Sequence, residues 1–185
     1  MQNGWKGAVK LRVNADAMTL YAVTDRTWVE DTTLMDQVKE ALEGGITFLQ
    51  LREKHLSKEE FIKEAREMKE LSKEYKVPFV INDNIEVALA VDADGVHIGQ
   101  DDMSVEEARK LLGEDKIIGV SAHNVEEAIK AQKGGADYLG VGAVCATSTK
   151  KDANVVSKEE IKKICHTVEI PVVAIGGIKK KISRH

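Results

Sequence analysis

Short apolar runs alternate with longer stretches of helical periodicity along this chain. Seven runs are rich in β-branched residues and bounded by turn residues, which predicts strands. They lie at residues 19–25, 47–53, 78–83, 95–100, 116–122, 137–144 and 171–177. The amphipathic stretches between them predict helices at residues 33–43, 57–75, 85–91, 104–112, 125–133 and 157–168. The chain is therefore a regular alternation of strand and helix.

Several predicted helices carry chemical markers at their ends. Ser104 is followed three residues later by Glu107, which is the pattern of a capping box at a helix start. Glycine stands near three helix ends, at Gly44, Gly113 and Gly134. These markers support the helix boundaries independently of periodicity.

Strands that are nearly apolar throughout and separated by helices indicate a parallel sheet covered by helices, either doubly wound or closed as a barrel. The even spacing of the strands and the polar residues at their carboxyl ends favour the barrel. We therefore predict an α/β fold of the (β/α)8 TIM-barrel type.

The predicted barrel forms one domain over residues 1–185, because a chain of this length with 43% hydrophobic residues supplies one sizeable core. Seven strands can be read, and only IKKKISRH follows the seventh. A closed eight-stranded barrel needs about 200 to 250 residues. We therefore expect the eighth βα unit to be missing and the barrel to be incomplete after about residue 178.

The composition narrows the class of partner. A net charge of −4 creates no general basic field, so neither nucleic acid nor an anionic membrane surface is an expected partner. The two cysteines have no CxxC spacing, which argues against a disulfide framework or a zinc site and suits the cytoplasm. No apolar run approaches the ~20 residues that span a bilayer. Small molecules are the expected ligands.

Polar residues alternate along the end of the second predicted strand. Gln50, Arg52 and Lys54 point the same way in an extended chain and would present an amide and two cations to a diphosphate. The alternative is that these charges pair with Glu53 and with neighbouring helices.

Aspartates close the next two predicted strands. Asp83 and Asp102 would meet over the barrel mouth, and Mg²⁺ prefers one or two carboxylates together with waters and phosphate oxygens. The alternative is that Asp83, and Asp101 or Asp102, are helix N-caps.

Two late turns suit a phosphate group. The turn after the sixth strand carries Thr147, Thr149 and Lys150, whose hydroxyls, backbone N–H groups and charge could hold an anion. The glycine pair ending at Gly177 allows backbone to approach a ligand, although paired glycines are also ordinary turn residues.

Three reactive side chains have plainer interpretations. His97 lies inside an apolar strand and is predicted to be a buried, hydrogen-bonded core histidine. Cys145 is predicted to be a packed thiol, because no base lies beside it in the sequence. His123 remains a minor candidate.

The ordered segments LYAVTD, GGITFLQLREK, PFVINDN, ADGVHIGQDD, IGVSAHN, GADYLGVGAV, TSTKKDA and IPVVAIGGI resemble those of thiamine phosphate synthases. The resemblance runs from about residue 20 to residue 178, and the combination of QLREK, IND, GQxD and TSTK is highly specific. It implies a transferase of thiamine biosynthesis that joins hydroxymethylpyrimidine diphosphate to hydroxyethylthiazole phosphate. The implied mechanism is dissociative and Mg²⁺-assisted: the pyrimidine C–O bond breaks first, pyrophosphate is released, and the thiazole nitrogen attacks.

The resemblance also assigns roles to residues. The pyrimidine diphosphate would be held by Gln50, Arg52, Lys54, Asn82, Ser121 and Lys150. Mg²⁺ would be held by Asp83 and Asp102. The thiazole phosphate would be held by Thr147, Thr149 and Gly177. The groups expected to act in catalysis are Arg52, Lys54, Ser121 and Lys150.

Two other functions compete with the synthase. A thiazole tautomerase shares the barrel but performs an isomerisation that needs no diphosphate or magnesium set. A barrel that lacks its last unit could also be a non-catalytic phosphate-binding remnant. Unpaired edges of the first and seventh strands would then weaken the fold and favour self-association.

Overall fold

The computed structural model describes residues 12–29, 31–145 and 155–178. Each of the seven predicted strands is present within its predicted range. They form one parallel sheet in chain order. The strands are β1 (Tyr21–Val23), β2 (Phe48–Leu51), β3 (Phe79–Asn82), β4 (Gly95–Ile98), β5 (Ile117–Ala122), β6 (Tyr138–Val141) and β7 (Val172–Ala174).

All six predicted helices are confirmed. They are α1 (Leu34–Glu43), α2 (Lys58–Glu74), α3 (Ile85–Ala90), α4 (Val105–Leu112), α5 (Val125–Gly134) and α6 (Lys158–Thr167). The predicted capping box forms at α4, where Ser104 accepts from the backbone of Glu107 and the Glu107 side chain accepts in return. Two short 3-10 helices, η1 (Asp16–Met18) and η2 (Arg26–Trp28), were not predicted.

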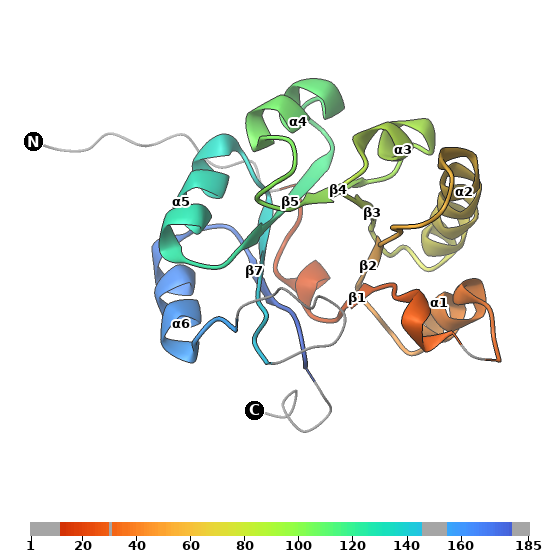
Figure 1. The fold of residues 1–185 in the computed structure, drawn as a ribbon, viewed down its shortest axis with the longest axis horizontal. Helices are drawn as coiled ribbons and strands as arrows, with labels where there is room; N and C mark the ends of the chain where they lie inside the picture. Colours follow the sequence, from red (N-terminus) through yellow and green to blue (C-terminus); the bar gives the residue numbers. More distant parts are fainter. Residues whose placement is uncertain (1–11, 30, 146–154, 179–185) are drawn as a thin grey trace, which may run out of the picture.

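The sheet is a nearly closed barrel rather than a doubly wound sheet. Each strand pairs in parallel with the next along the chain, from β1 through β7, whereas a doubly wound sheet reverses its strand order. Helices α1 to α6 lie in an arc around the outside of the curved sheet (Figure 1). Within the described ranges β1 and β7 do not pair with each other, and no eighth strand is seen.

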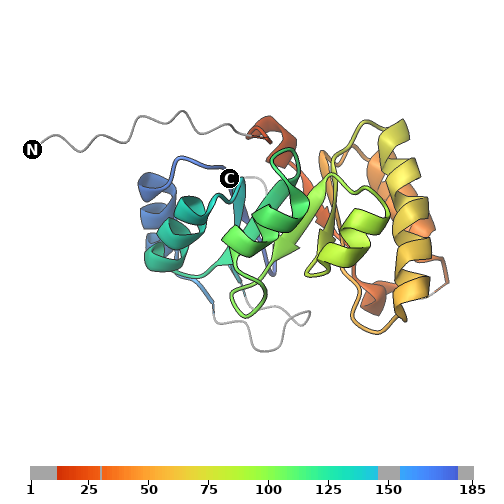
Figure 2. The ribbon, with the colours of Figure 1, turned by 90° about the horizontal axis from the view of Figure 1, so that it is seen from above.

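Alternation along the strands produces two apolar layers. Leu49, Leu51 and Ile81 face outward and pack against the helices in the larger cluster. Phe48 and Tyr138 face inward and form a smaller cluster that also receives side chains from β1, β3, β5 and β7. Figure 2, turned by 90°, shows α1 and α2 at one end of the arc and α5 and α6 at the other.

The amino-terminal segment closes one end of the barrel. Val13, which precedes η1, and Met18, the last residue of η1, belong to the interior cluster. Arg12 and Arg109 both form ion pairs with Asp137, which is 2% exposed and precedes β6. Because this end is packed, the opposite end, where the strands finish, is the end available to a ligand. In the described part of the chain no helix is long and apolar enough to cross a membrane.

Candidate active site

The carboxyl ends of the parallel strands gather most of the predicted site residues at one mouth of the barrel. Gln50, Asn82 and Ser121 lie in the last part of β2, β3 and β5. Arg52 and Asp83 directly follow β2 and β3. This is the end at which (β/α) barrels build their active sites.

Two carboxylates meet at this mouth. Asp83 follows β3 with a left-handed backbone (φ 60°), and its Oδ1 accepts a hydrogen bond of 2.8 Å from Asn82 Nδ2. Lys54 Nζ forms an ion pair with Asp83 Oδ2. Asp102, in the turn after β4, accepts from the backbone N–H of Gly99 at 2.7 Å. Asp83 and Asp102 are close enough to interact through their side chains.

Burial raises the pKa of the Asp83 carboxyl above its usual value. The nearby Lys54 ammonium opposes this shift, and the neighbouring Asp102 carboxylate adds to it. Two carboxylates that repel each other in this way favour a divalent cation between them. The donor set therefore fits Mg²⁺. No group of three or more His, Cys, Asp or Glu side chains suited to a metal occurs among the described residues.

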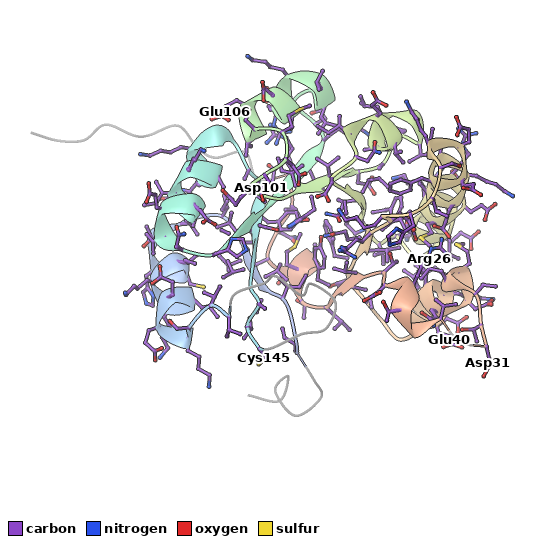
Figure 3. All side chains as sticks on the ribbon, viewed as in Figure 1. Arg26, Asp31, Glu40, Asp101, Glu106 and Cys145 are labelled. Carbon is purple, nitrogen blue, oxygen red and sulfur yellow. The ribbon has the colours of Figure 1, made fainter. Side chains whose placement is uncertain are left out.

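The helix-capping alternative for these aspartates is wrong. Asn84 caps α3 by accepting from the backbone N–H of Val87, and Ser104 caps α4. The Asp83 and Asp102 carboxylates therefore cap neither helix and remain at the barrel mouth. Figure 3 places the exposed Asp101 beside β4 and β5.

The charges at the end of β2 separate into two groups. Glu53 is buried and pairs with Arg26 of η2 at 2.6 Å, and Arg26 also reaches Glu64 of α2 at 2.5 Å. Burial raises the pKa of Glu53, which Arg26 offsets. Figure 3 shows Arg26 in the region between α1 and α2. Arg52 is half-buried, and none of the described carboxylates pairs with it. Its guanidinium is therefore available to an anion.

His97 is the buried, hydrogen-bonded histidine that was predicted. Its Nε2 lies 3.0 Å from Ser121 Oγ, so this core residue also contacts a predicted site residue. Sequence reasoning missed this contact, together with Tyr21, whose hydroxyl accepts from Gln50 Nε2 at 2.6 Å. His97 and Tyr21 lie inside apolar strands rather than at their polar carboxyl ends, so the sequence offered no reason to place them near the site.

The remaining candidates divide by position. Thr147, Thr149 and Lys150 lie outside the described residues. Gly177 follows β7 with φ 68°, a left-handed conformation that suits glycine. His123 is hydrogen-bonded to Glu127 of α5, with 2.9 Å between His123 Nδ1 and Glu127 Oε2. Cys145 is a half-buried free thiol in the loop that follows β6.

Comparison with known proteins gives consistent matches. The family profile described as thiamine monophosphate synthase matches residues 20–184. A thiamine-phosphate synthase of Clostridium acetobutylicum is 54% identical over 162 residues, which cover 88% of this chain and 77% of the relative. One from Methanobrevibacter smithii is 51% identical over 164 residues, 89% of this chain and 78% of the relative. The solved thiamine phosphate pyrophosphorylase of Pyrococcus furiosus has a TM-score of 0.82 and 43% identity, covering 90% of this chain and 79% of that one.

The parallel strands in chain order and the charged mouth at their carboxyl ends define a (β/α)-barrel enzyme. Within that class, the chain belongs to the thiamine monophosphate synthase family, whose members are transferases.

Proposed function

We propose that this protein condenses hydroxymethylpyrimidine diphosphate with hydroxyethylthiazole phosphate to give thiamine phosphate and pyrophosphate. The observation that carries the proposal is the barrel mouth, where Asp83, Asp102 and Lys54 lie at adjacent strand ends together with Arg52, which pairs with none of the described carboxylates. Membership of the synthase family supports the same reaction.

The chemistry requires negative charge to be stabilised as pyrophosphate leaves. Arg52, which pairs with none of the described carboxylates, could form a bidentate contact with the diphosphate, and Lys54, held by Asp83, supplies a second cation. Ser121 and Asn82 contribute polar groups from β5 and β3. Lys150, with Thr147, Thr149 and Gly177, completes the proposed substrate set. The barrel wall holds the two substrates in line and keeps water from the cation formed by C–O cleavage.

Asp83 and Asp102 are the proposed magnesium ligands. Burial raises the pKa of Asp83 and the neighbouring Asp102 adds to the shift, and a divalent cation between the two carboxylates would favour their charged forms. When bound there, Mg²⁺ would supply positive charge to the diphosphate oxygens. The side-chain amide of Asn82 holds Asp83 Oδ1 and so fixes the carboxylate that faces Asp102.

The direct test is to supply both substrates to the purified 185-residue chain and to measure pyrophosphate and thiamine phosphate, with and without Mg²⁺. We expect both products in equal amounts, dependent on Mg²⁺ and on each substrate. Isomerisation of a thiazole without pyrophosphate release would indicate a tautomerase instead. Saturable binding of both substrates without product would indicate a phosphate-binding remnant.

We propose further that the protein acts in the cytoplasm on these small molecules. The free thiols of Cys145 and Cys165 suit a reducing compartment. Self-association through the outer strands β1 and β7 is proposed on the ground that sheet edges offer unpaired backbone groups.

A further inference from the structure

A continuous chain of hydrogen bonds crosses the interior of the barrel. It begins where Gln50 Nε2 donates to the Tyr21 hydroxyl at 2.6 Å, and that hydroxyl lies 2.7 Å from the hydroxyl of Tyr138. The Tyr138 hydroxyl lies 3.0 Å from His97 Nδ1, and His97 Nε2 lies 3.0 Å from Ser121 Oγ. The five residues come from five different strands, so no local sequence motif contains the chain.

The interior is shaped to accept this chain. Tyr138 is 0% exposed, Gln50 is 3% exposed and His97 is 7% exposed. A Cβ atom at Gly119 would lie 2.0 Å from Tyr138 Cζ, and one at Gly140 would lie 2.9 Å from His97 Cε1. The two rings therefore occupy space that exists because β5 and β6 carry glycine at these positions.

Burial raises the pKa of both the Tyr21 and the Tyr138 hydroxyl, so both stay protonated at neutral pH. Where each hydroxyl accepts from one neighbour in the chain and donates to the other, and the neutral imidazole carries one N–H, the hydrogen bonds run in one of two senses. In the first sense Gln50 donates at one end and His97 Nε2–H donates to Ser121 at the other. In the second sense Ser121 donates to His97 Nε2, and Tyr21 donates to the Gln50 carbonyl oxygen.

We propose that Tyr21, Tyr138 and His97 act as positioning residues, because their hydrogen-bond chain couples the orientation of the Gln50 amide to that of the Ser121 hydroxyl. The structure places Gln50 Nε2 toward the Tyr21 hydroxyl, which is how the first sense begins. Gln50 then keeps its carbonyl oxygen and one N–H for a ligand, and Ser121 is left with its O–H to donate. In the second sense Gln50 would offer two donors, and the Ser121 proton would be consumed by His97.

The consequence for substrate choice rests on the proposed function. One acceptor beside one donor on Gln50 matches the edge of an aminopyrimidine, which carries an amino donor beside a ring-nitrogen acceptor. A free Ser121 O–H matches an anionic oxygen. An oxopyrimidine would need the second sense, which withdraws the Ser121 donor. The hydrogen-bond chain thus couples recognition of the pyrimidine ring by Gln50 to the availability of the Ser121 O–H as a donor to the diphosphate.

The first test measures the tautomer of His97 and uses no substrate. In ¹⁵N-histidine-labelled full-length protein, with the signal assigned by its loss in His97→Asn, we expect the N–H on Nε2. Gln50→Glu, measured where the carboxylate is ionised, only accepts from Tyr21 and so forces the second sense, which moves the proton to Nδ1. Adding Tyr21→Phe to Gln50→Glu breaks the link and restores Nε2–H. One unchanged tautomer in folded wild-type and Gln50→Glu proteins would overturn the proposal.

A second test of the coupling measures ligand affinity and does not require Gln50→Glu to fold. Calorimetry gives the ratio of affinities for an aminopyrimidine diphosphate and the matching oxopyrimidine diphosphate. We expect Tyr138→Phe, which keeps the ring but removes the hydroxyl, to lower this ratio about tenfold, the size of one lost hydrogen bond. The control Tyr75→Phe, at the exposed end of α2, leaves the ratio unchanged. An unchanged ratio in Tyr138→Phe overturns the coupling, whereas a wild-type protein that binds selectively without turnover counts only against the proposed function.

Discussion

Two arginines near the barrel mouth differ in whether a carboxylate contacts them. Arg26 holds the buried Glu53 and also reaches Glu64, whereas none of the described carboxylates pairs with Arg52. A cation with internal partners stabilises the fold, and a half-buried cation without one is a group prepared for an anion. The two residues should therefore respond differently to the same substitution.

We predict that Arg52→Ala weakens binding of a diphosphate about tenfold or more, the loss of a charge-assisted contact, with little change in stability. Arg26→Ala should instead lower the free energy of unfolding by about 1–3 kcal/mol, because Glu53 is left buried and unpaired. Calorimetric titration and urea unfolding of both variants measure the two effects. A larger stability loss in Arg52→Ala than in Arg26→Ala would contradict these assignments.

Ionised Asp83 lowers the stability of the metal-free folded state, and a bound metal ion would remove this unfavourable contribution. Its pKa is raised by burial and by Asp102, so the folded state binds a proton at Asp83 more readily than the unfolded state does. Metal-free stability should therefore fall as pH rises from the ordinary pKa of 3.8 through the raised value. Above that window the cost is fully present.

We predict that Asp83→Asn removes this fall and stabilises the metal-free protein by up to about 1 kcal/mol at neutral pH. Asparagine tolerates the left-handed backbone at this position, so the substitution keeps the turn. Thermal unfolding as a function of pH, with and without Mg²⁺, measures the pH dependence of stability and the stabilisation by the metal. Stabilisation of Asp83→Asn by Mg²⁺ equal to that of the wild type would remove Asp83 from the metal site.

At the scale of elements, a tyrosine side chain of β6 lies directly against the backbone of β5. Gly119 pairs in register with Tyr138, whose ring occupies the space beside the glycine. Backbone hydrogen bonds fix this register, and the tyrosine is fully buried. Neither strand can move away without breaking the sheet. Close packing of this kind makes a glycine necessary for volume rather than for backbone conformation.

We predict that Gly119→Ala lowers the free energy of unfolding by about 1–3 kcal/mol, the usual range for overpacking a core. Gly44→Ala is the matched control, because Gly44 is exposed at the end of α1 with φ −72°, which alanine also adopts. Denaturant unfolding of the two variants provides the comparison. Equal stability would show that the barrel interior accommodates the extra methyl group.

Periodicity predicted every described strand and α-helix because each is a local pattern, whereas the two short 3-10 helices were not predicted. The capping box at Ser104 and Glu107 was readable for the same reason. The sequence could not reveal that Glu53 pairs with Arg26, because that contact depends on the spatial arrangement of β2 and η2. The contact of His97 with Ser121 was likewise hidden, since it joins neighbouring strands whose register comes from tertiary structure.

At the scale of the molecule, the curved sheet has two outer strands, and within the described ranges β1 and β7 each pair on one side only. Large apolar side chains are exposed close to these edges, at Leu20, Ile175 and Ile178. Exposed strand edges with apolar neighbours are templates for association.

We predict concentration-dependent self-association in sedimentation velocity experiments, reduced by Ile175→Lys because a charge beside the β7 edge opposes pairing. Leu111→Lys is the control, since Leu111 is 55% exposed on α4 and lies away from both edges. A monomer at all concentrations, or an equal effect of the two substitutions, would show that the edges do not drive association.

The proposed function makes the barrel mouth a metal-dependent diphosphate site. Calorimetric titration of the 185-residue chain with inorganic pyrophosphate, with and without Mg²⁺, and of the Asp83→Asn variant in parallel, tests this proposal. We expect saturable binding that requires Mg²⁺ and is lost in Asp83→Asn. Binding of equal strength without Mg²⁺, or in the Asp83→Asn variant, would refute the proposed site.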